Sequence, residues 1–223
     1  MEPGIKYGFN PSTSPQDAQD LMRRKMKEVE DFGNLALNKK WEDKGVTKGV
    51  HFWTFSDSHY FVFKTDMDIN LPLETVIRYA DDLEFRKQYD DGMKSCQIIT
   101  DYKDGLRIFR YMIKGQWPVS ERDFVMLQAN YFKDKDTYCS YACDASCYNY
   151  PEEKGVVRAE CYFTSTTFTR KDANTTNCVT VSRTDPRIKA IPQFILNTKT
   201  KEIAMQCLGF KEKSEQAEKA RRG

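Results

Sequence analysis

Residues 185–208 read DPRIKAIPQFILNTKTKEIAMQCL, and this stretch predicts a long helix at the end of a chain that is otherwise rich in strands. Pro186 and Pro192 indicate a turn before the helix, because proline has no backbone N–H to donate inside a helix. The apolar residues that follow cover much of the helix surface, with a polar interruption at residues 198–202. A helix with so much apolar surface must pack against a second element.

The residues before this helix predict a sheet. Residues 60–69 alternate apolar and polar side chains with a period of two, which is typical of a half-buried strand. Between residues 96 and 184, runs rich in β-branched and aromatic residues are separated by turn signals at residues 104–105, 115–121, 133–136 and 149–155. We therefore expect an α+β fold in which a curved antiparallel sheet wraps around the long C-terminal helix and leaves a hollow between them.

Helical spacing occurs at two earlier places. Ser14 and Pro15 provide an N-cap and a first helical residue, and the apolar stripe that follows predicts a helix that ends near residue 38. After Pro72 the spacing of apolar residues is helical again, and a second short helical piece is expected at residues 85–89. These helices interrupt the strands without dividing the chain.

Length and charge indicate one soluble intracellular domain. We expect a flexible N-terminus at residues 1–14, one domain at residues 15–212 and a charged, frayed tail at residues 213–223. The formal net charge of +2 gives no general attraction to nucleic acid, and no segment has the roughly 20 apolar residues that span a bilayer. A cytoplasmic monomer that touches membranes only at their surface fits this composition.

The seven cysteines are an odd number in a chain long enough to fold without disulfides, so reduced thiols are expected. Cys139, Cys143 and Cys147 suggest a metal site by their number, but their spacing is wider than the pairs that usually bind zinc. Alternate residues of a strand share one face, so we interpret these cysteines as small buried residues. Neither a metal nor a cofactor is expected.

Three stretches resemble the START family of lipid-transfer domains. They are FRKQYD at residues 85–90, PVSERDFV at residues 118–125, and DPR at residues 185–187 followed by Ile191-Pro192 and Asn197. The resemblance covers residues 15–210, and its first stretch is most similar to members that bind phosphatidylcholine. Tyr89 and Arg187 depart from the family pattern, in which tryptophan and glycine are usual. The resemblance implies a helix-grip fold with an internal tunnel for a single lipid.

The resemblance also implies a headgroup site. In members that bind phosphatidylcholine, an arginine at the position of Arg86 meets the phosphate, and an aromatic cage holds the choline, to which each ring contributes about 0.5–2 kcal/mol. The cage positions correspond to Tyr111, Phe124 and Tyr162, and Thr164 follows on the same strand. Alternatively, the aromatic residues are ordinary core residues, and Arg86 forms an ion pair with a nearby aspartate, namely Asp82, Asp90 or Asp91.

Sterol-binding members of this family carry an acid and an arginine on neighbouring strands inside the cavity. This sequence has Met112 and Gln128 at those cavity-lining positions. Loss of both charged partners together is tolerable, whereas loss of one leaves an unpaired buried charge. The pair therefore argues against a sterol ligand.

A gate is implied where the C-terminal helix meets the loop before the second matching stretch. Trp117 suits a membrane interface, where tryptophan is enriched, although it would equally plug the mouth of a pocket. Lysines at positions 199, 201, 211 and 213 add attraction to anionic lipids or simply form a solvated helix face. The gate residues are Trp117, Pro118, Phe194, Ile195, Ile203 and Cys207.

These patterns predict a non-catalytic protein that binds one lipid, a phospholipid such as phosphatidylcholine, and transfers it between membranes. An enzyme on the same scaffold is the first alternative, but His51 and His59 are the only histidines and no Gly-x-Ser-x-Gly motif occurs. A lipid-sensing module whose gate helix meets a protein partner is the second.

Overall fold

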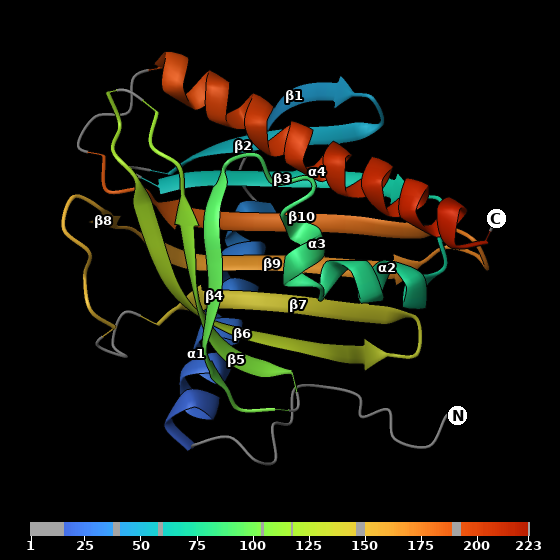
Figure 1. The fold of residues 1–223 in the computed structure, drawn as a ribbon, viewed down its shortest axis with the longest axis horizontal. Coiled ribbons are helices and arrows are strands. Elements are labelled where there is room, and N and C mark those ends of the chain that lie inside the picture. Colours follow the sequence, from blue (N-terminus) through green and yellow to red (C-terminus); the bar gives the residue numbers. More distant parts are fainter. Residues whose placement is uncertain are drawn as a thin grey trace.

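The computed structural model describes residues 16–37, 41–57, 60–103, 105–116, 118–145, 150–188 and 193–222. In this part of the chain one ten-stranded sheet carries helices on both faces (Figure 1). The helices are α1 (Gln16–Leu37), α2 (Leu73–Ala80), α3 (Leu83–Arg86) and α4 (Gln193–Arg222). The strands are β1 (Glu42–Thr47), β2 (Val50–Asp57), β3 (Tyr60–Ile69), β4 (Met93–Asp101), β5 (Leu106–Ile113), β6 (Arg122–Asp134), β7 (Thr137–Asp144), β8 (Val157–Arg158), β9 (Glu160–Arg170) and β10 (Thr176–Asp185).

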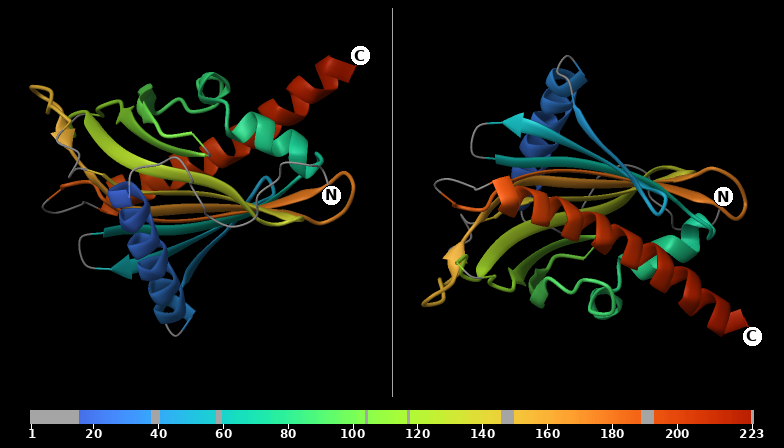
Figure 2. Two further views of the ribbon diagram at one scale, coloured as in Figure 1. Left: turned by 90° about the horizontal axis from the view of Figure 1, so that it is seen from below. Right: turned by 90° about the horizontal axis from the view of Figure 1, so that it is seen from above.

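The strands follow the order β1-β2-β3-β10-β9-β7-β6-β5-β4 and are antiparallel, apart from β8, which pairs parallel with β6. The pairing of β3 with β10 joins the early strands to the late ones. Figure 2 shows α1 on one face of the sheet and α2, α3 and α4 on the other, toward which β4, β5 and β6 bend. We call the face under α4 the inner face and the face under α1 the outer face. The predicted helix-grip fold is confirmed.

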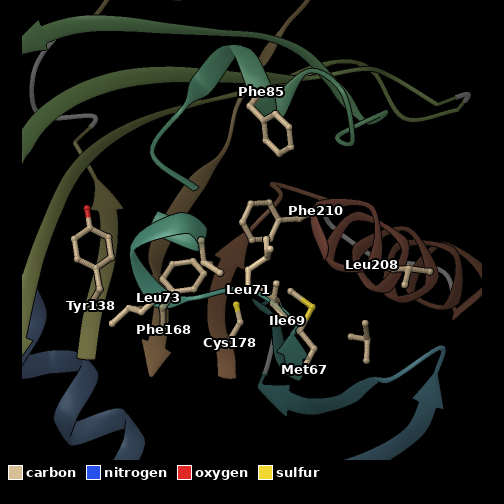
Figure 3. Packing of buried hydrophobic residues seen from close by; sticks show 12 residues of the cluster. Met67, Ile69, Leu71, Leu73, Phe85, Tyr138, Phe168, Cys178, Leu208 and Phe210 are labelled. Atoms are coloured by element: carbon tan, nitrogen blue, oxygen red, sulfur yellow. The ribbon is translucent and has the colours of Figure 1, made fainter. Parts of the chain in front are cut away.

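Apolar side chains form a cluster on each face. The largest inner cluster joins the ends of β3 and β10 to α2, α3 and α4, with Phe210 of α4 packed near Phe85 and Phe168 (Figure 3). The outer cluster packs Ala18 and Met22 of α1 on the sheet, where Met22 is fully buried. A further cluster, which we call the end cluster, lies on β5, β6, β7 and β9 and contains Phe109, Phe124, Met126, Ala142, Ala159 and Cys161.

Most elements follow the sequence patterns, and β1 and β2 are the exceptions. Residues 42–47 of β1 are exposed throughout, so they carry no alternation that predicts a strand. Cys139 and Cys143 of β7 are buried beside Tyr141 on the outer face, as predicted. Cys147 lies outside the described residues.

The charged tail expected at residues 213–223 is instead, as far as Arg222, the last part of α4. Ser214 is 0% exposed and Glu218 is 1% exposed. The Glu215 carboxylate accepts hydrogen bonds from Asn70, and Glu218 forms a 2.7 Å ion pair with Arg78 of α2. Charged residues that are typical of a solvated tail therefore attach the end of α4 to the bend after β3 and to α2.

Two of the motif stretches meet in space. Arg122 of β6 donates from Nε to the Pro186 carbonyl oxygen at 3.0 Å, and its side chain is buried. The residue after Pro186, Arg187, has a φ of 54°, a left-handed conformation in which glycine is favoured. The Asp185 carboxylate accepts the Arg187 N–H at 2.7 Å, and this hydrogen bond supports the turn.

We predict that Arg187→Gly raises the free energy of unfolding by about 1 kcal/mol, because glycine relieves the strain of a left-handed residue. Arg187→Ala is the matched control, since it removes the exposed ion pair with Glu160 and keeps the strain. Urea unfolding of the three proteins measures both effects. Glycine and alanine variants of equal stability would contradict the strain argument.

We predict that Met22→Ala lowers the free energy of unfolding by about 2–5 kcal/mol, because it empties a fully buried site between α1 and the sheet. Arg23→Ala, on the exposed side of the same helix, should change it by less than about 0.5 kcal/mol. Denaturant titration compares them. Similar small losses for both variants would mean that α1 contributes little to the fold.

Candidate functional site on the inner face

Arg86 occupies a fixed place at the end of α3. The Asp82 carboxylate caps this helix by accepting the backbone N–H groups of Glu84 and Phe85 at 2.9 Å and 3.0 Å. Phe85 is 5% exposed and belongs to the large inner cluster. The Asp82 cap and the buried Phe85 ring therefore hold the backbone of Arg86 in position.

The Arg86 side chain pairs with a buried carboxylate. Its Nε donates to Asp90 Oδ2 at 2.9 Å, and the Tyr111 hydroxyl donates to the same oxygen at 2.7 Å. The Asp90 side chain is 4% exposed, whereas the Arg86 side chain is 34% exposed. The guanidinium carbon lies 4.7 Å from the centre of the Tyr111 ring, and the Phe124 ring is 6.5 Å from that of Tyr111. We call these four residues the Arg86 cluster.

The environment of this cluster keeps its phenols neutral and its guanidinium protonated. Burial raises the pKa of Tyr111, and the charge of Asp90 raises it further, so the phenol stays a donor. Burial lowers the pKa of Arg86, but its interactions with Tyr111, Tyr89 and Asp90 outweigh this and raise it. Burial also raises the pKa of Tyr89 to about 12. At neutral pH the cluster thus contains a charged guanidinium with accessible surface and neutral phenols around it.

Thr164 lies on the inner face next to the end cluster. Its hydroxyl is 2.8 Å from the Ser182 hydroxyl and 3.5 Å from the Cys161 sulfur, which belongs to that cluster. Thr166 and Thr180 form a similar hydroxyl pair at 3.0 Å on the same two strands. The inner face of β9 and β10 therefore carries two adjacent pairs of small hydroxyl groups, and Thr164 stays partly exposed.

Gln128 also points to the inner face, within a chain of hydrogen bonds. Arg107 donates to Gln128 at 2.7 Å, and Gln128 donates to Ser140 at 2.9 Å. The chain continues through Asn130 to Asp81, whose carboxylate also accepts the Tyr138 hydroxyl at 2.5 Å. Met112 lies elsewhere: it pairs with Asp123 on the outer face, where it is 3% exposed. The two expected cavity-lining residues therefore do not face each other.

Tyr162 lies on the outer face, apart from Tyr111 and Phe124. A β-bulge between β9 and β10 pairs Arg183 with Phe163 and Thr184 with Cys161, so Tyr162 is the extra residue. Its ring lies 4.4 Å from the Lys25 ammonium of α1 and 4.3 Å from the Arg183 guanidinium. Its hydroxyl donates to Glu28 of α1. The expected third wall of the aromatic cage is thus a contact for α1, because the bulge reverses the direction of this side chain.

The expected gate falls largely outside the described part of the chain. Trp117 lies outside it, as do the side chains of Phe194 and Ile195. Pro118 is exposed, and Ile203 is partly exposed on α4. Cys207 faces the sheet, with its sulfur 3.7 Å from the Thr65 hydroxyl of β3.

Sequence reasoning did not assign Asp90 or Arg107 to the site. Asp90 is four residues after Arg86, the spacing at which helical side chains meet, and it was considered only as the partner of a surface ion pair. Arg107 carries no signal of its own, since its partner Gln128 is on another strand. Among the residues that the structure describes, no group of histidine, cysteine or acidic side chains could hold a metal ion, and no helix is long and apolar enough to cross a membrane.

The fold and the matched sequence define a START domain. A family model described as START domain matches residues 37–214, so the chain belongs to the START domain family and the predicted resemblance is confirmed. The matched range begins at the last residue of α1 and ends before the last turns of α4. No curated protein sequence matches the chain.

Solved structures share the fold at low sequence identity. Human StAR-related lipid transfer protein 5 is 19% identical with a TM-score of 0.74, over 88% of this chain and 98% of that chain. Human STARD10 is 18% identical with a TM-score of 0.70, over 82% of this chain and 76% of that chain. The human StarD13 (DLC2) lipid transfer and protein localization domain is 14% identical with a TM-score of 0.64, over 83% and 95%. These similarities establish the fold alone.

We predict that Tyr162→Ala and Tyr111→Ala loosen different parts of the molecule. Loss of the Tyr162 ring should speed amide hydrogen exchange in α1, because Lys25 and Glu28 lose their contact, and leave α3 unchanged. Loss of the Tyr111 ring should speed exchange in α3, because Asp90 and Arg86 lose their contact with it, and leave α1 unchanged. Hydrogen exchange read by mass spectrometry compares the two. Faster exchange in α3 after Tyr162→Ala would contradict the outer position of this ring.

Proposed function

We propose that this protein binds a single phospholipid, such as phosphatidylcholine, between the inner face of the sheet and α4, and transfers it between membranes. The observation that carries the proposal is the Arg86 side chain, which is 34% exposed although its partner Asp90 is 4% exposed. Among the described residues no second carboxylate pairs with Arg86. A phosphate is the group that an arginine with this free surface binds best.

The surroundings of Arg86 suit the rest of such a lipid. Tyr111 of the Arg86 cluster packs against the end cluster, to which Phe124 itself belongs, so apolar surface begins beside the charge. Thr164, which lies beside Cys161 of the end cluster, offers a hydroxyl for an ester or phosphate oxygen. Tyr111 and Phe124 can contact a choline group, although Tyr162 does not join them. The site therefore supports a phosphate more strongly than it supports choline.

The proposed transfer rests on the energetics of lipid burial. Burial of a lipid chain gains about 0.8 kcal/mol per CH2 group, but the bilayer provides nearly the same gain. Exchange between the two is close to balanced, and the barrier is exposure of the chains to water on the way. A carrier must therefore open at the membrane surface and close before it leaves, and α4 is one of the three helices on the inner face, where it packs over β2 and β3 (Figure 2).

We predict that native mass spectrometry of the protein detects one bound phospholipid, and that the protein moves phosphatidylcholine between vesicles. Arg86→Gln should slow this transfer about tenfold or more, since a charged hydrogen bond contributes about 1.5–3 kcal/mol. Lys87→Gln is the matched control, because Lys87 is the exposed neighbour and, within the described part of the chain, pairs with Glu84 alone. Absence of both bound lipid and transfer would reject the proposal, and equal rates for the two variants would reject the role of Arg86.

A further inference from the structure

We infer that Asp90 is a specificity-determining residue that makes the site select lipids without a net headgroup charge over anionic lipids. This inference rests on the proposed function and goes beyond it by adding a residue and a basis for selection. The observation is the arrangement of charge: the only cation of the Arg86 cluster already has a carboxylate partner at 2.9 Å. Before any ligand enters, the cluster is electrically neutral.

The Asp90 charge is held inside the molecule by two donors. Arg86 Nε and the Tyr111 hydroxyl both donate to Oδ2, and the side chain is 4% exposed. A buried carboxylate of this kind cannot turn toward water to make room for a second anion. A ligand phosphate must therefore share Arg86 with Asp90.

Nearby charges do not alter this balance. Arg107 is the next cation along the inner face, and its Nε is bonded to Gln128. Its field acts on Asp81, which lies in the loop before α3 and bonds Tyr138 and Asn130. Lys87, on the turn after Arg86, is exposed and pairs with Glu84. Of these two arginines, Arg86 thus has Asp90 as its ion-pair partner, and Arg107 has Asp81 within reach of its charge.

Neutrality of the site has a consequence for the ligand. A phosphodiester with a headgroup ammonium brings its own countercharge, so the total charge in the site stays at zero. A phosphodiester without one adds an uncompensated negative charge where water is scarce, which is unfavourable. Tyr111 and Phe124 also present rings, which attract an ammonium and not an anion.

The test compares two lipids that share the phosphodiester and differ in net charge, phosphatidylcholine and phosphatidylglycerol with identical acyl chains. Both are presented at equal amounts in the same vesicles, so attraction of the protein to the membrane surface acts on both. The ratio of the two lipids bound to the protein is read by native mass spectrometry. We expect the unaltered protein to favour phosphatidylcholine about tenfold, which corresponds to about 1.4 kcal/mol.

Asp90→Asn keeps the shape of the side chain and removes its charge. It should shift the ratio about tenfold toward phosphatidylglycerol, because Arg86 then lacks a countercharge. Asp91→Asn is the matched control: Asp91 is exposed, and its backbone oxygen accepts a hydrogen bond from Lys114. It should leave the ratio unchanged. The double variant Arg86→Gln with Asp90→Asn is neutral again and should lose the shift toward phosphatidylglycerol.

The outcomes separate the inference from the proposed function. If no lipid binds to the unaltered protein, the proposed function fails. If both lipids bind equally, or if folded Asp90→Asn retains the original ratio, the inference is overturned and lipid binding stands. Should Asp90→Asn fail to fold, Arg86→Gln tests the same charge balance, because it removes the cation and leaves the Asp90 carboxylate. The site is then negative, and binding of phosphatidylglycerol must fall more than binding of phosphatidylcholine. Equal loss of both lipids overturns the inference.

Discussion

The pairing of β3 with β10 is the contact on which the rest of the structure depends. It places residues 60–69 beside residues 176–185 and makes one sheet from strands at the two ends of the chain. Because side chains alternate along a strand, this register determines which residues face α4 and which face α1. Cys178 and Met67 meet on the inner face beneath Leu208 of α4, and Phe163 faces α1 on the other side.

Much of this arrangement could be predicted from patterns of apolar residues. The period of β3, the turn signals between the later strands and the apolar face of α4 all specify elements by burial, which the sequence records directly. β1 was missed because all of its residues are exposed, so it carries no apolar alternation. The end of α4 was also missed, because its Glu218 is buried through pairing with Arg78, Arg221 and Arg222. Charged residues that are buried in pairs look the same in sequence as charged residues in water.

Residues of the candidate site could be predicted only where regular alternation along a strand determines the face of the sheet on which a side chain lies and the residue beside it. Regular pairing of β5 and β6 sets Tyr111 opposite Phe124, and the Arg86 guanidinium lies over the Tyr111 ring, while a role of these residues in lipid binding stays a prediction. Tyr162 does not join them, because a single extra residue in β9 turns its side chain to the other face. Met112 follows the same rule of alternation and lies opposite Asp123. A bulge has no compositional signal here, so the position of every residue near it required the structure.

The close approach of Gly209 to Tyr89 links the covering helix to the Arg86 cluster. A Cβ atom at position 209 would lie 3.1 Å from the Cβ of Tyr89 and 3.2 Å from its carbonyl oxygen, and Phe210 packs on the Tyr89 ring at 5.3 Å. Tyr89 directly precedes Asp90 in the chain. The backbone that carries the carboxylate therefore rests on the backbone of α4 with no side chain between them. A shift of α4 at this point would therefore have to be accompanied by a shift of the backbone next to the Asp90 carboxylate.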